Sequence, residues 1–588
     1  MCPDADPLAG RRARAPGAIG LAVFVAALLA PRVALQWAGP DAQLSLMMDD
    51  ASYYFEAARR ALAGGTWPSA DGVHPTNGFH PLYLLVVTAV QAAVGEGPRA
   101  LVSAMMAFNL ACNSLAVVLL ARFVVFRDED GRGAAGVAAA VLLALSPGWL
   151  VHGTIGVENS LSSLLVLAAV LQWDRRYGGV PPAASWGRAA RDGALLGLAA
   201  LGRSDALLLA GVYALAGAWR MRPALGPAGA LREVVALGAG AAAVLAPWWI
   251  ANLAMFGTIA QDSGVALAAR FARDYGPHTS AVSLRAEATG VAFWLYRFLW
   301  AGGLVPLTAW LLAVAMPFER LRSASRTGRS LVAVVVLAAA SLLLRANDPT
   351  DVRDIGQAAL ELALAVPAFG FGLVCARPVR VRMRAVHGVA FAAAALTVAA
   401  YAIGFRGFQV WYASGFSLAA VLFAAWGALP AMLRGRRAFT AALLALLCVQ
   451  SALVVRGWLE RGGREGMDRA LFANGEALRG RLEAFAASRG GAVKIGSFDS
   501  GEFAFRVHPF PIVNADGVMN HAAAVAIRDG SLARWMRAEG VTHLVTSPLR
   551  IAQYRRVENF PAVYDSAASA AIGMETYLLD WAGAPAGR

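Results

Sequence analysis

Long apolar stretches alternate with short polar stretches from residue 17 to residue 455, and the alternation ends there. A helix needs about 20 apolar residues to cross the hydrocarbon core of a bilayer. The pattern therefore predicts thirteen membrane spans, expected at residues 17–37, 101–123, 134–151, 156–173, 193–202, 205–219, 232–251, 290–316, 329–345, 355–376, 386–405, 411–432 and 438–455.

Two of these pieces, 193–202 and 205–219, are each too short to cross a bilayer alone. We expect them to form a pair that meets at or just below the outer membrane surface, with Arg203 and Asp205 at the junction. Interrupted helices in membranes usually line a cavity. The junction is therefore a candidate functional site.

The arginines between the spans predict the orientation, because cytoplasmic loops are enriched in Lys and Arg. With the N-terminus inside, every loop expected in the cytoplasm carries arginine, for example Arg127, Arg322 and Arg380. This topology requires residues 79–94, which are short for a span, to lie at the outer surface. We expect a multi-pass protein of the inner or plasma membrane, with a cytoplasmic N-terminus and an extracytoplasmic C-terminal region.

Composition supports the membrane interpretation and excludes an ordinary soluble enzyme. Hydrophobic residues make up 58% of the chain and charged residues 15%, and the mean hydropathy is +0.54. The formal net charge of +14 does not indicate a nucleic-acid partner, because the arginines are spread over many loops instead of forming one basic face. The four cysteines are scattered, without the spacing of a metal site.

The C-terminal region, residues 457–588, has the pattern of a small extracytoplasmic α/β domain, whereas residues 1–456 form the transmembrane domain. The expected elements are a helix from about residue 467, strands at 493–498, 511–514 and 542–546, and helices around 520–528 and 531–539. The predicted fold class is thus a mainly α polytopic membrane protein with a small α/β domain. Fold alone does not fix whether this region binds an acceptor or a carbohydrate.

The first loop, residues 39 to about 100 with its interfacial helices, holds the densest polar cluster of the transmembrane domain. Loops of this length in a compact domain are usually functional. Asp49 and Asp50 precede a short helix expected at 51–63. Asp50 is either the N-cap of that helix or, like Asp49, a candidate general base at the membrane surface.

The first loop also carries two His-Pro pairs around a turn, at residues 74–75 and 80–81. His80 lies next to an apolar run, where a cation or hydrogen-bond donor could hold a phosphate. His74, Asn77 and Tyr53 are further candidate donor or substrate contacts, although an exposed loop histidine needs no special role. The spacing is not a known metal-ligand signature, so we predict no metal ligand and no cofactor, and a divalent metal is left open.

Four charged residues near the expected outer ends of later spans complete the set of candidates. Glu158 opens the fourth span, where the helix dipole favours a carboxylate, but an ionisable group among apolar neighbours is also a functional candidate. Arg203 and Asp205 form either a structural ion pair or a substrate contact. Arg270 could bind an anionic headgroup or simply be solvated.

Several blocks of this sequence resemble bacterial membrane glycosyltransferases of the GT-C fold, the superfamily of mannosyltransferase-like and aminoarabinose-transferase-like enzymes. The blocks are Asp49-Asp50-Ala51-Ser52-Tyr53-Tyr54-Phe55, Pro75-Thr76-Asn77-Gly78-Phe79-His80-Pro81-Leu82-Tyr83, Gly156-Val157-Glu158-Asn159, Gly202-Arg203-Ser204-Asp205 and residues 247–264, and in the C-terminal region residues 494–501 and 513–520. Asn159 and Asp262 depart from the residues that are usual in this superfamily, which affects the expected donor contacts.

The resemblance implies transfer of a hexose or pentose from a polyprenyl-phosphate sugar to a hydroxyl of a glycan, lipid or protein acceptor at the extracytoplasmic face, in cell-envelope assembly. It implies that Asp50, or Asp49 beside it, is the base, that Glu158 helps to position a substrate and that His80 lies near the phosphate. Attack from the face opposite the phosphate would invert the anomeric centre.

Two other functions are compatible with a polytopic chain of this kind. A transporter or flippase of lipid-linked sugars also needs many spans and charges within the membrane, but such proteins often contain internal repeats and sites at mid-bilayer. This sequence has no evident repeat, and its polar cluster is expected outside the bilayer. A non-catalytic membrane scaffold is the third candidate, and it would be indifferent to loss of Asp49 or Asp50.

Overall fold

The computed structural model describes the first loop, part of the helical domain and most of the C-terminal region. The described residues are 32–126, 153–179, 185–275, 385–405, 474–557 and 560–581, with gaps at 45, 65–66, 96 and 492 and with a few isolated residues elsewhere. Of the predicted spans, those at 134–151, 290–316, 329–345, 355–376, 411–432 and 438–455, and most of 17–37, lie outside these residues.

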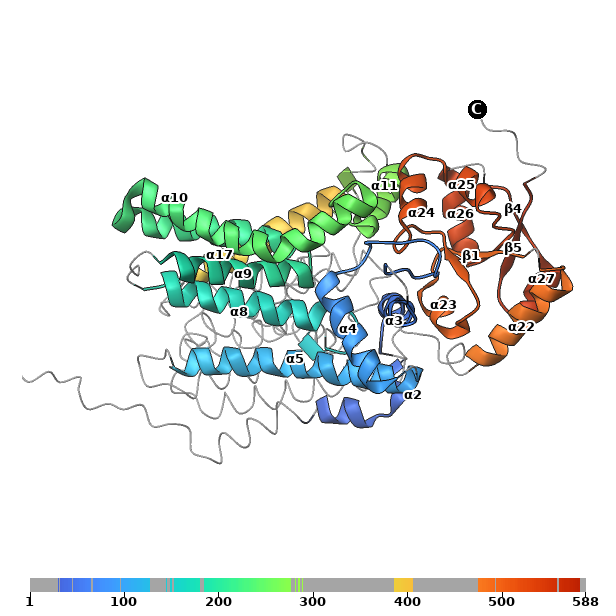
Figure 1. Cartoon of the computed structure of the whole chain (residues 1–588), viewed down its shortest axis with the longest axis horizontal. Coiled ribbons are helices and arrows are strands. Elements are labelled where there is room, and N and C mark those ends of the chain that lie inside the picture. The colour runs from blue at the N-terminus through green and yellow to red at the C-terminus, as the bar shows by residue number, and fades with distance from the viewer. Residues whose placement is uncertain are drawn as a thin grey trace, which may run out of the picture.

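Five helices run side by side in the described part of the helical domain (Figure 1). They are α5 (Pro98–Phe126), α8 (Asn159–Tyr177), α9 (Trp186–Gly202), α10 (Ala206–Phe256) and α17 (Ala385–Ala399), the last continued by the π-helix η1 (Ala400–Phe405). Within the described residues, Pro98–Leu120 and Ala206–Phe256 are long and apolar enough to cross a membrane. These two helices support a membrane location.

The predicted short pieces 193–202 and 205–219 are both longer than expected, and this part of the prediction was wrong. Helix α9 already begins at Trp186, and α10 runs from Ala206 to a break at Gly226, where φ is 67° and ψ is 176°. Glycine adopts such a positive φ at little cost, so a sharp turn there reverses the chain before the predicted span 232–251. The expected junction at Arg203 and Asp205 does lie between α9 and α10.

Hydropathy failed to detect the first turns of α9 because they contain a buried charge. Asp192 is 2% exposed and accepts a hydrogen bond from Arg176 of α8 at 2.9 Å. Arg176 also pairs with Glu233 of α10, and the Tyr213 hydroxyl donates to Asp192 at 3.2 Å. Paired charges of this kind can lie inside a helical bundle, whereas a sliding hydropathy window counts them as polar loop residues.

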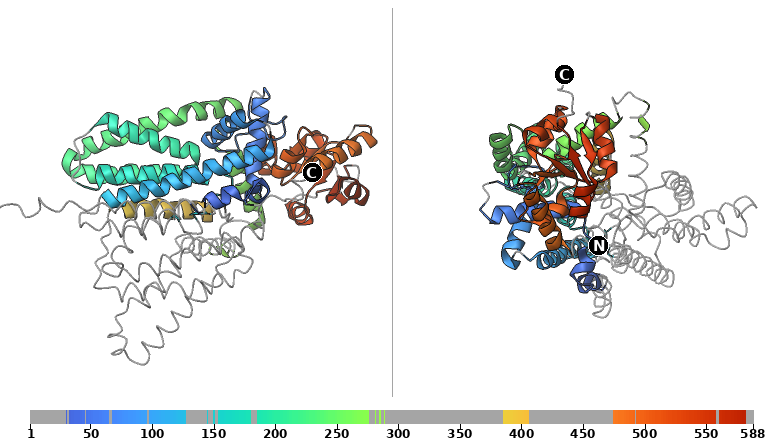
Figure 2. Two further views of the ribbon diagram at one scale, coloured as in Figure 1. Left: turned by 90° about the horizontal axis from the view of Figure 1, so that it is seen from below. Right: turned by 90° about the vertical axis from the view of Figure 1, so that its right-hand side faces the viewer.

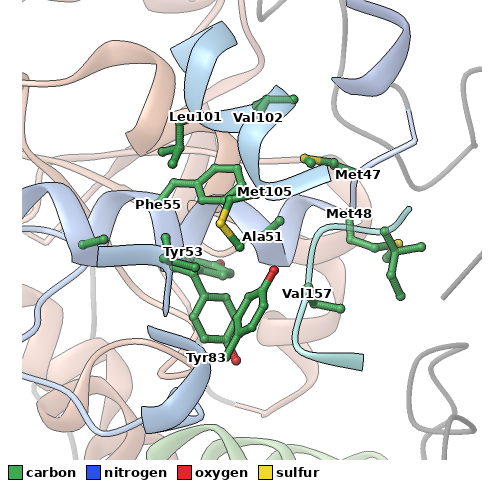
Figure 3. Packing of buried hydrophobic residues seen from close by; sticks show 14 of the residues in the cluster. Met47, Met48, Ala51, Tyr53, Phe55, Tyr83, Leu101, Val102, Met105 and Val157 are labelled. Carbon is green, nitrogen blue, oxygen red and sulfur yellow. The ribbon is translucent and has the colours of Figure 1, made fainter. Parts of the chain in front are cut away.

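The first loop folds into three helices, α2 (Pro40–Leu44), α3 (Asp49–Leu62) and α4 (Pro81–Val94). Helix α3 matches the helix expected at 51–63, but its N-cap is Met48, without a side-chain cap, so the N-cap interpretation of Asp50 was wrong. The apolar face of α3 packs against α4 and α5, and Figure 3 shows Ala51 and Phe55 close to Tyr83 and Met105. This packing fixes the direction of the first turn of α3.

The C-terminal region contains a five-stranded mixed sheet with strand order β2-β1-β3-β5-β4. Strands β1 (Ile495–Ser497), β2 (Ile512–Asn514) and β3 (His543–Val545) are parallel to one another and lie where the sequence predicted strands, whereas β4 (Ala562–Tyr564) and the antiparallel β5 (Thr576–Leu579) were not anticipated. The accompanying helices are α22 (Gly475–Ser488), α23 (Gly501–Val507), α24 (His521–Arg528), α25 (Leu532–Ala538), α26 (Pro548–Val557) and α27 (Ser566–Ile572).

The C-terminal region lies at one end of the bundle, against the first loop (Figure 2). Helix α23 packs on α3, and α11 (Asp262–Tyr275), which follows α10, packs on α24. The carboxyl ends of parallel strands meet at one edge of a sheet, and here those ends lead into Ser500 and Asp516, both of which contact Tyr53 of α3. The junction of bundle, first loop and sheet edge is the location of the candidate site.

Candidate active site

Asp49 and Asp50 occupy the first turn of α3 but have different partners. Asp49 accepts a hydrogen bond from the backbone N–H of Glu502 at 2.5 Å, in the first turn of α23. Residue 501 must be small here, because a Cβ on Gly501 would lie 2.8 Å from the backbone oxygen of Asp49. Asp49 is thus committed to the attachment of the C-terminal region.

Asp50 has no hydrogen-bond or ion-pair partner among the described residues, and its side chain is half-buried. Burial raises the pKa of Asp50 well above its ordinary value, and the nearby charges of Asp49 and Glu158 raise it further. A carboxylate that is unpaired and close to other acids accepts a proton more readily than an ordinary aspartate does. That property fits a general base.

Tyr53 lies one turn after Asp49 and connects α3 to the edge of the sheet. Its hydroxyl donates to Asp516 Oδ2 at 3.2 Å and accepts from the Ser500 N–H at 3.2 Å. Burial, followed by the nearby charge of Asp499, raises the pKa of Asp516 to about 6. The C-terminal region therefore places a second perturbed acid beside the first loop.

Asp499 is neutralised by a two-point contact with Arg550, in which both nitrogen–oxygen distances are 2.7 Å. Arg270, on α11, packs its guanidinium over the ring of Phe271, 5.5 Å from its centroid. The charge of Arg270 opposes the rise in the pKa of Asp516, of which burial is the main cause. Arg270 therefore lies on the sheet side of the site, facing the acids of the C-terminal region.

Glu158 is 4% exposed and lies at the start of α8, where its side chain does not cap the helix. Its carboxylate instead accepts hydrogen bonds from Arg203 at 2.7 Å and from the Tyr54 hydroxyl at 3.0 Å. His80 Nε2 lies 3.4 Å from the same carboxylate. The structure thus brings together three residues that the sequence predicted as separate candidates: Glu158, Arg203 and His80.

The expected ion pair between Arg203 and Asp205 is present, with Nε and Oδ2 2.9 Å apart. The Tyr401 hydroxyl, from η1, accepts from Arg203 and donates to Asp205, both at 3.0 Å. Arg203 is therefore held by two carboxylates and a tyrosine. Such a residue is rigid, and it can present a fixed positive charge at the end of the bundle.

His80 is the residue before α4, and its imidazole lies between two groups. Nε2 faces Glu158, and Nδ1 lies 3.3 Å from Nε2 of Gln261. Burial lowers the pKa of His80 below its ordinary value, although the charge of Glu158 opposes this effect. Gln261 lies in the block at residues 247–264, but it was not predicted as a site residue.

His74 and Asn77 lie apart from the Glu158 group, in contacts that join loops to one another. His74 Nδ1 is 2.7 Å from Asp71 Oδ2, and its Nε2 is 3.2 Å from Glu539 of the C-terminal region. Asn77 exchanges hydrogen bonds with Asp262 at 3.0 and 2.8 Å. The predicted donor-binding set therefore divides into two groups. His74 and Asn77 lie at an interface, and the others lie at the site: Tyr53, His80, Arg203, Asp205 and Arg270.

No group of three or more His, Cys, Asp or Glu residues in the described part of the chain is arranged to hold a metal ion. Three residues of the site were not predicted as such, although they lie in the blocks at 494–501, 513–520 and 247–264: Asp499, Asp516 and Gln261. Asp499 and Asp516 do follow predicted strands, and the rule that ligands bind beyond the carboxyl ends of parallel strands is the signal that could have found them.

The structure is similar to crystal structures of ArnT from Cupriavidus metallidurans. The ArnT structure bound to undecaprenyl phosphate has 17% sequence identity to this chain and a TM-score of 0.44, and the match covers 97% of this chain and 100% of that chain. It is also similar to the oligosaccharyltransferase AglB from Archaeoglobus fulgidus in complex with an inhibitory peptide and a dolichol-phosphate, at 14% identity and a TM-score of 0.40, with 97% and 75% covered. No family model matches the sequence, and no curated protein matches it.

Proposed function

We propose that this protein is a membrane glycosyltransferase that moves a sugar from a polyprenyl-phosphate donor to an acceptor hydroxyl at the extracytoplasmic face. One observation carries the proposal. The unpaired carboxylate of Asp50 lies where the end of an apolar bundle meets the first loop and the C-terminal region, beside a buried group of Glu158, Arg203 and His80. A base and a phosphate-binding group at a membrane surface are what this transfer requires.

In this mechanism Asp50 removes the proton from the acceptor hydroxyl as the oxygen attacks the anomeric carbon of the donor. A positioned general base contributes roughly 10² to 10⁴ in rate. The raised pKa of Asp50 suits the task, because the ionised carboxylate is then basic enough to take a proton from a hydroxyl group. Asp49 acts as a positioning residue, since its carboxylate is occupied by the N–H of Glu502.

The bond from the anomeric carbon to the phosphate oxygen breaks as the new glycosidic bond forms, and the polyprenyl phosphate leaves with the electron pair. His80 is proposed to turn the N–H at Nε2, which faces Glu158 at 3.4 Å in this structure, towards that phosphate, with the Arg203 guanidinium nearby. Glu158 holds the His80 imidazole and the Arg203 guanidinium in place. Attack from the side opposite the phosphate inverts the anomeric configuration.

The arginine pattern of the loops supports an extracytoplasmic position for this site and for the C-terminal region. The apolar surface of the bundle would then accommodate the polyprenyl tail within the membrane, while the acceptor approaches from the side of the sheet. Asp516 and the Asp499–Arg550 pair would line that approach. Carboxylates and a guanidinium suit a hydroxyl-rich acceptor, because they provide both hydrogen-bond acceptors and donors.

Release of free polyprenyl phosphate from a panel of polyprenyl-phosphate sugars, with candidate acceptors present, tests this proposal. The parent protein should consume one donor, and the product should have the opposite anomeric configuration. Asp50→Asn should be folded but strongly slowed. Asp529→Asn changes an exposed residue at the C-terminal end of α24, and this matched control should retain activity.

The same protein in liposomes separates the transferase from a transporter. Movement of an intact lipid-linked sugar across the bilayer, with no release of polyprenyl phosphate, would favour the transporter and contradict the proposal. Equal activity of the parent and of Asp50→Asn would instead show that Asp50 is not the base.

A further inference from the structure

The turn between α10 and α11 contacts the start of α4 through Gln261. Its side-chain amide donates to the Phe79 carbonyl at 2.8 Å and lies 3.3 Å from His80 Nδ1. Its amide oxygen accepts from the Ser204 hydroxyl at 2.9 Å, in the turn that carries Arg203. Gln261 therefore supports His80 on the side opposite to Glu158 and ties it to the α9–α10 junction.

The next residue, Asp262, anchors this turn to the first loop. Its side chain is 2% exposed, and Oδ2 accepts from the Thr76 hydroxyl and from the Asn77 N–H, both at 3.0 Å. The N–H of Asp262 in turn donates to Asn77 Oδ1 at 2.8 Å. A buried carboxylate is stable only when its oxygens are satisfied, so these contacts constrain both loops.

The second oxygen of Asp262 contacts the C-terminal region. Oδ1 lies 2.7 Å from Nδ1 of His521, the first residue of α24. The N–H of His521 donates to the Pro75 carbonyl at 3.3 Å, and its ring lies 4.7 Å from that of Phe256 at the end of α10. One carboxylate thus joins the first loop, the α10–α11 turn and the C-terminal region.

We infer that Asp262 is a positioning residue that couples attachment of the C-terminal region to the orientation of His80, through the neighbouring Gln261. The inference rests on the proposed function, in which His80 binds the donor phosphate. When His521 and the first loop hold Asp262, Gln261 is fixed and the His80 imidazole is held between two partners. When that support is lost, the imidazole can rotate and the donor phosphate binds less tightly.

Three variants remove successive links in this chain of contacts. His521→Ala removes the partner on the C-terminal region, Asp262→Asn removes the buried charge, and Gln261→Leu removes the amide beside His80. Because the His521 side chain is 25% exposed, His521→Ala can be studied even if Asp262→Asn fails to fold. The measurement is equilibrium binding of undecaprenyl phosphate to the purified full-length protein, with thermal melting as a check on folding.

Each of the three variants should weaken binding by about tenfold, a typical size for coupling between sites. The loss should disappear when His80 is already replaced by Gln, because the effect acts through His80. In turnover, the donor KM should rise while kcat at saturating donor changes little. Additive losses in the His80→Gln background, or unchanged binding by His521→Ala and Gln261→Leu, would overturn the inference.

Glu539→Gln is the matched control, because Glu539 also joins the C-terminal region to the first loop, through His74 at 3.2 Å. Any loss of binding in this variant should be additive with His80→Gln. If the parent does not bind undecaprenyl phosphate, the proposed function fails and the inference fails with it. If the parent binds but His80→Gln binds equally well, only the role of His80 and the coupling to it are contradicted.

Discussion

The Glu158 side of the site and the Asp50 side differ in how their charges are balanced. Glu158 is buried and has Arg203, Tyr54 and His80 as partners. Asp50 has no partner among the described residues and lies close to other acids. A fully paired group keeps one geometry and one charge state, whereas an unpaired acid near like charges can exchange a proton. In the proposed mechanism, the first side holds the donor and the second removes the proton from the acceptor.

The largest effect that separates the two sides is expected from Asp50→Asn. It should lower kcat by roughly 10² to 10⁴ while the donor KM and the melting temperature stay near those of the parent, since Asp50 supports no contact in the described structure. Steady-state release of polyprenyl phosphate, with melting measured in the same detergent, checks this. A large drop in melting temperature would show that Asp50 has a structural role.

Arg203→Ala should have the opposite profile, with its main effect on stability. It leaves Glu158 and Asp205 without their guanidinium, and breaking a buried ion pair by removing one partner costs about 3–5 kcal/mol. The melting temperature should fall clearly, and Arg203→Lys should recover part of the loss. Unchanged melting of Arg203→Ala would contradict the description of this side as a rigid, paired group.

Gly501→Ala tests the attachment of the C-terminal region with a single methyl group. The added Cβ would meet the Asp49 backbone oxygen at 2.8 Å, and overpacking of this kind costs about 1–3 kcal/mol. Limited proteolysis should release the C-terminal region faster, and turnover should fall moderately. Gly480→Ala is the control, because a Cβ there would meet no atom within 4 Å.

Asp49→Asn is expected to have the smallest effect, a shift in pH dependence. The charge of Asp49 contributes to the raised pKa of Asp50. Its removal makes ionisation of Asp50 easier, so the pKa of Asp50 falls and the acid limb of the activity profile moves to lower pH. The pH dependence of kcat/KM for both proteins measures this, and a shift to higher pH would contradict the assignment.

The sequence predicted the part of the site that lies in local motifs. Asp50 is recognisable before the helix at 51–63, and Arg203 and Asp205 stand out as charges between apolar pieces. The sequence could not predict that Asp49 contacts Glu502 or that His74 contacts Glu539, because each of these contacts joins segments hundreds of positions apart. The length of α9 was also missed, because the charge of Asp192 is neutralised by Arg176 on the neighbouring helix α8, a pairing that hydropathy does not register.

The most direct test of the central claim is the pH dependence of a single round of transfer by the parent and by Asp50→Asn, with enzyme in excess over donor. The parent rate should fall on the acid side as the carboxylate of Asp50 is protonated. The variant should be slow throughout and should lack that acid limb. A variant that keeps the parent's rate, or the same acid limb, would contradict the claim that Asp50 is the base.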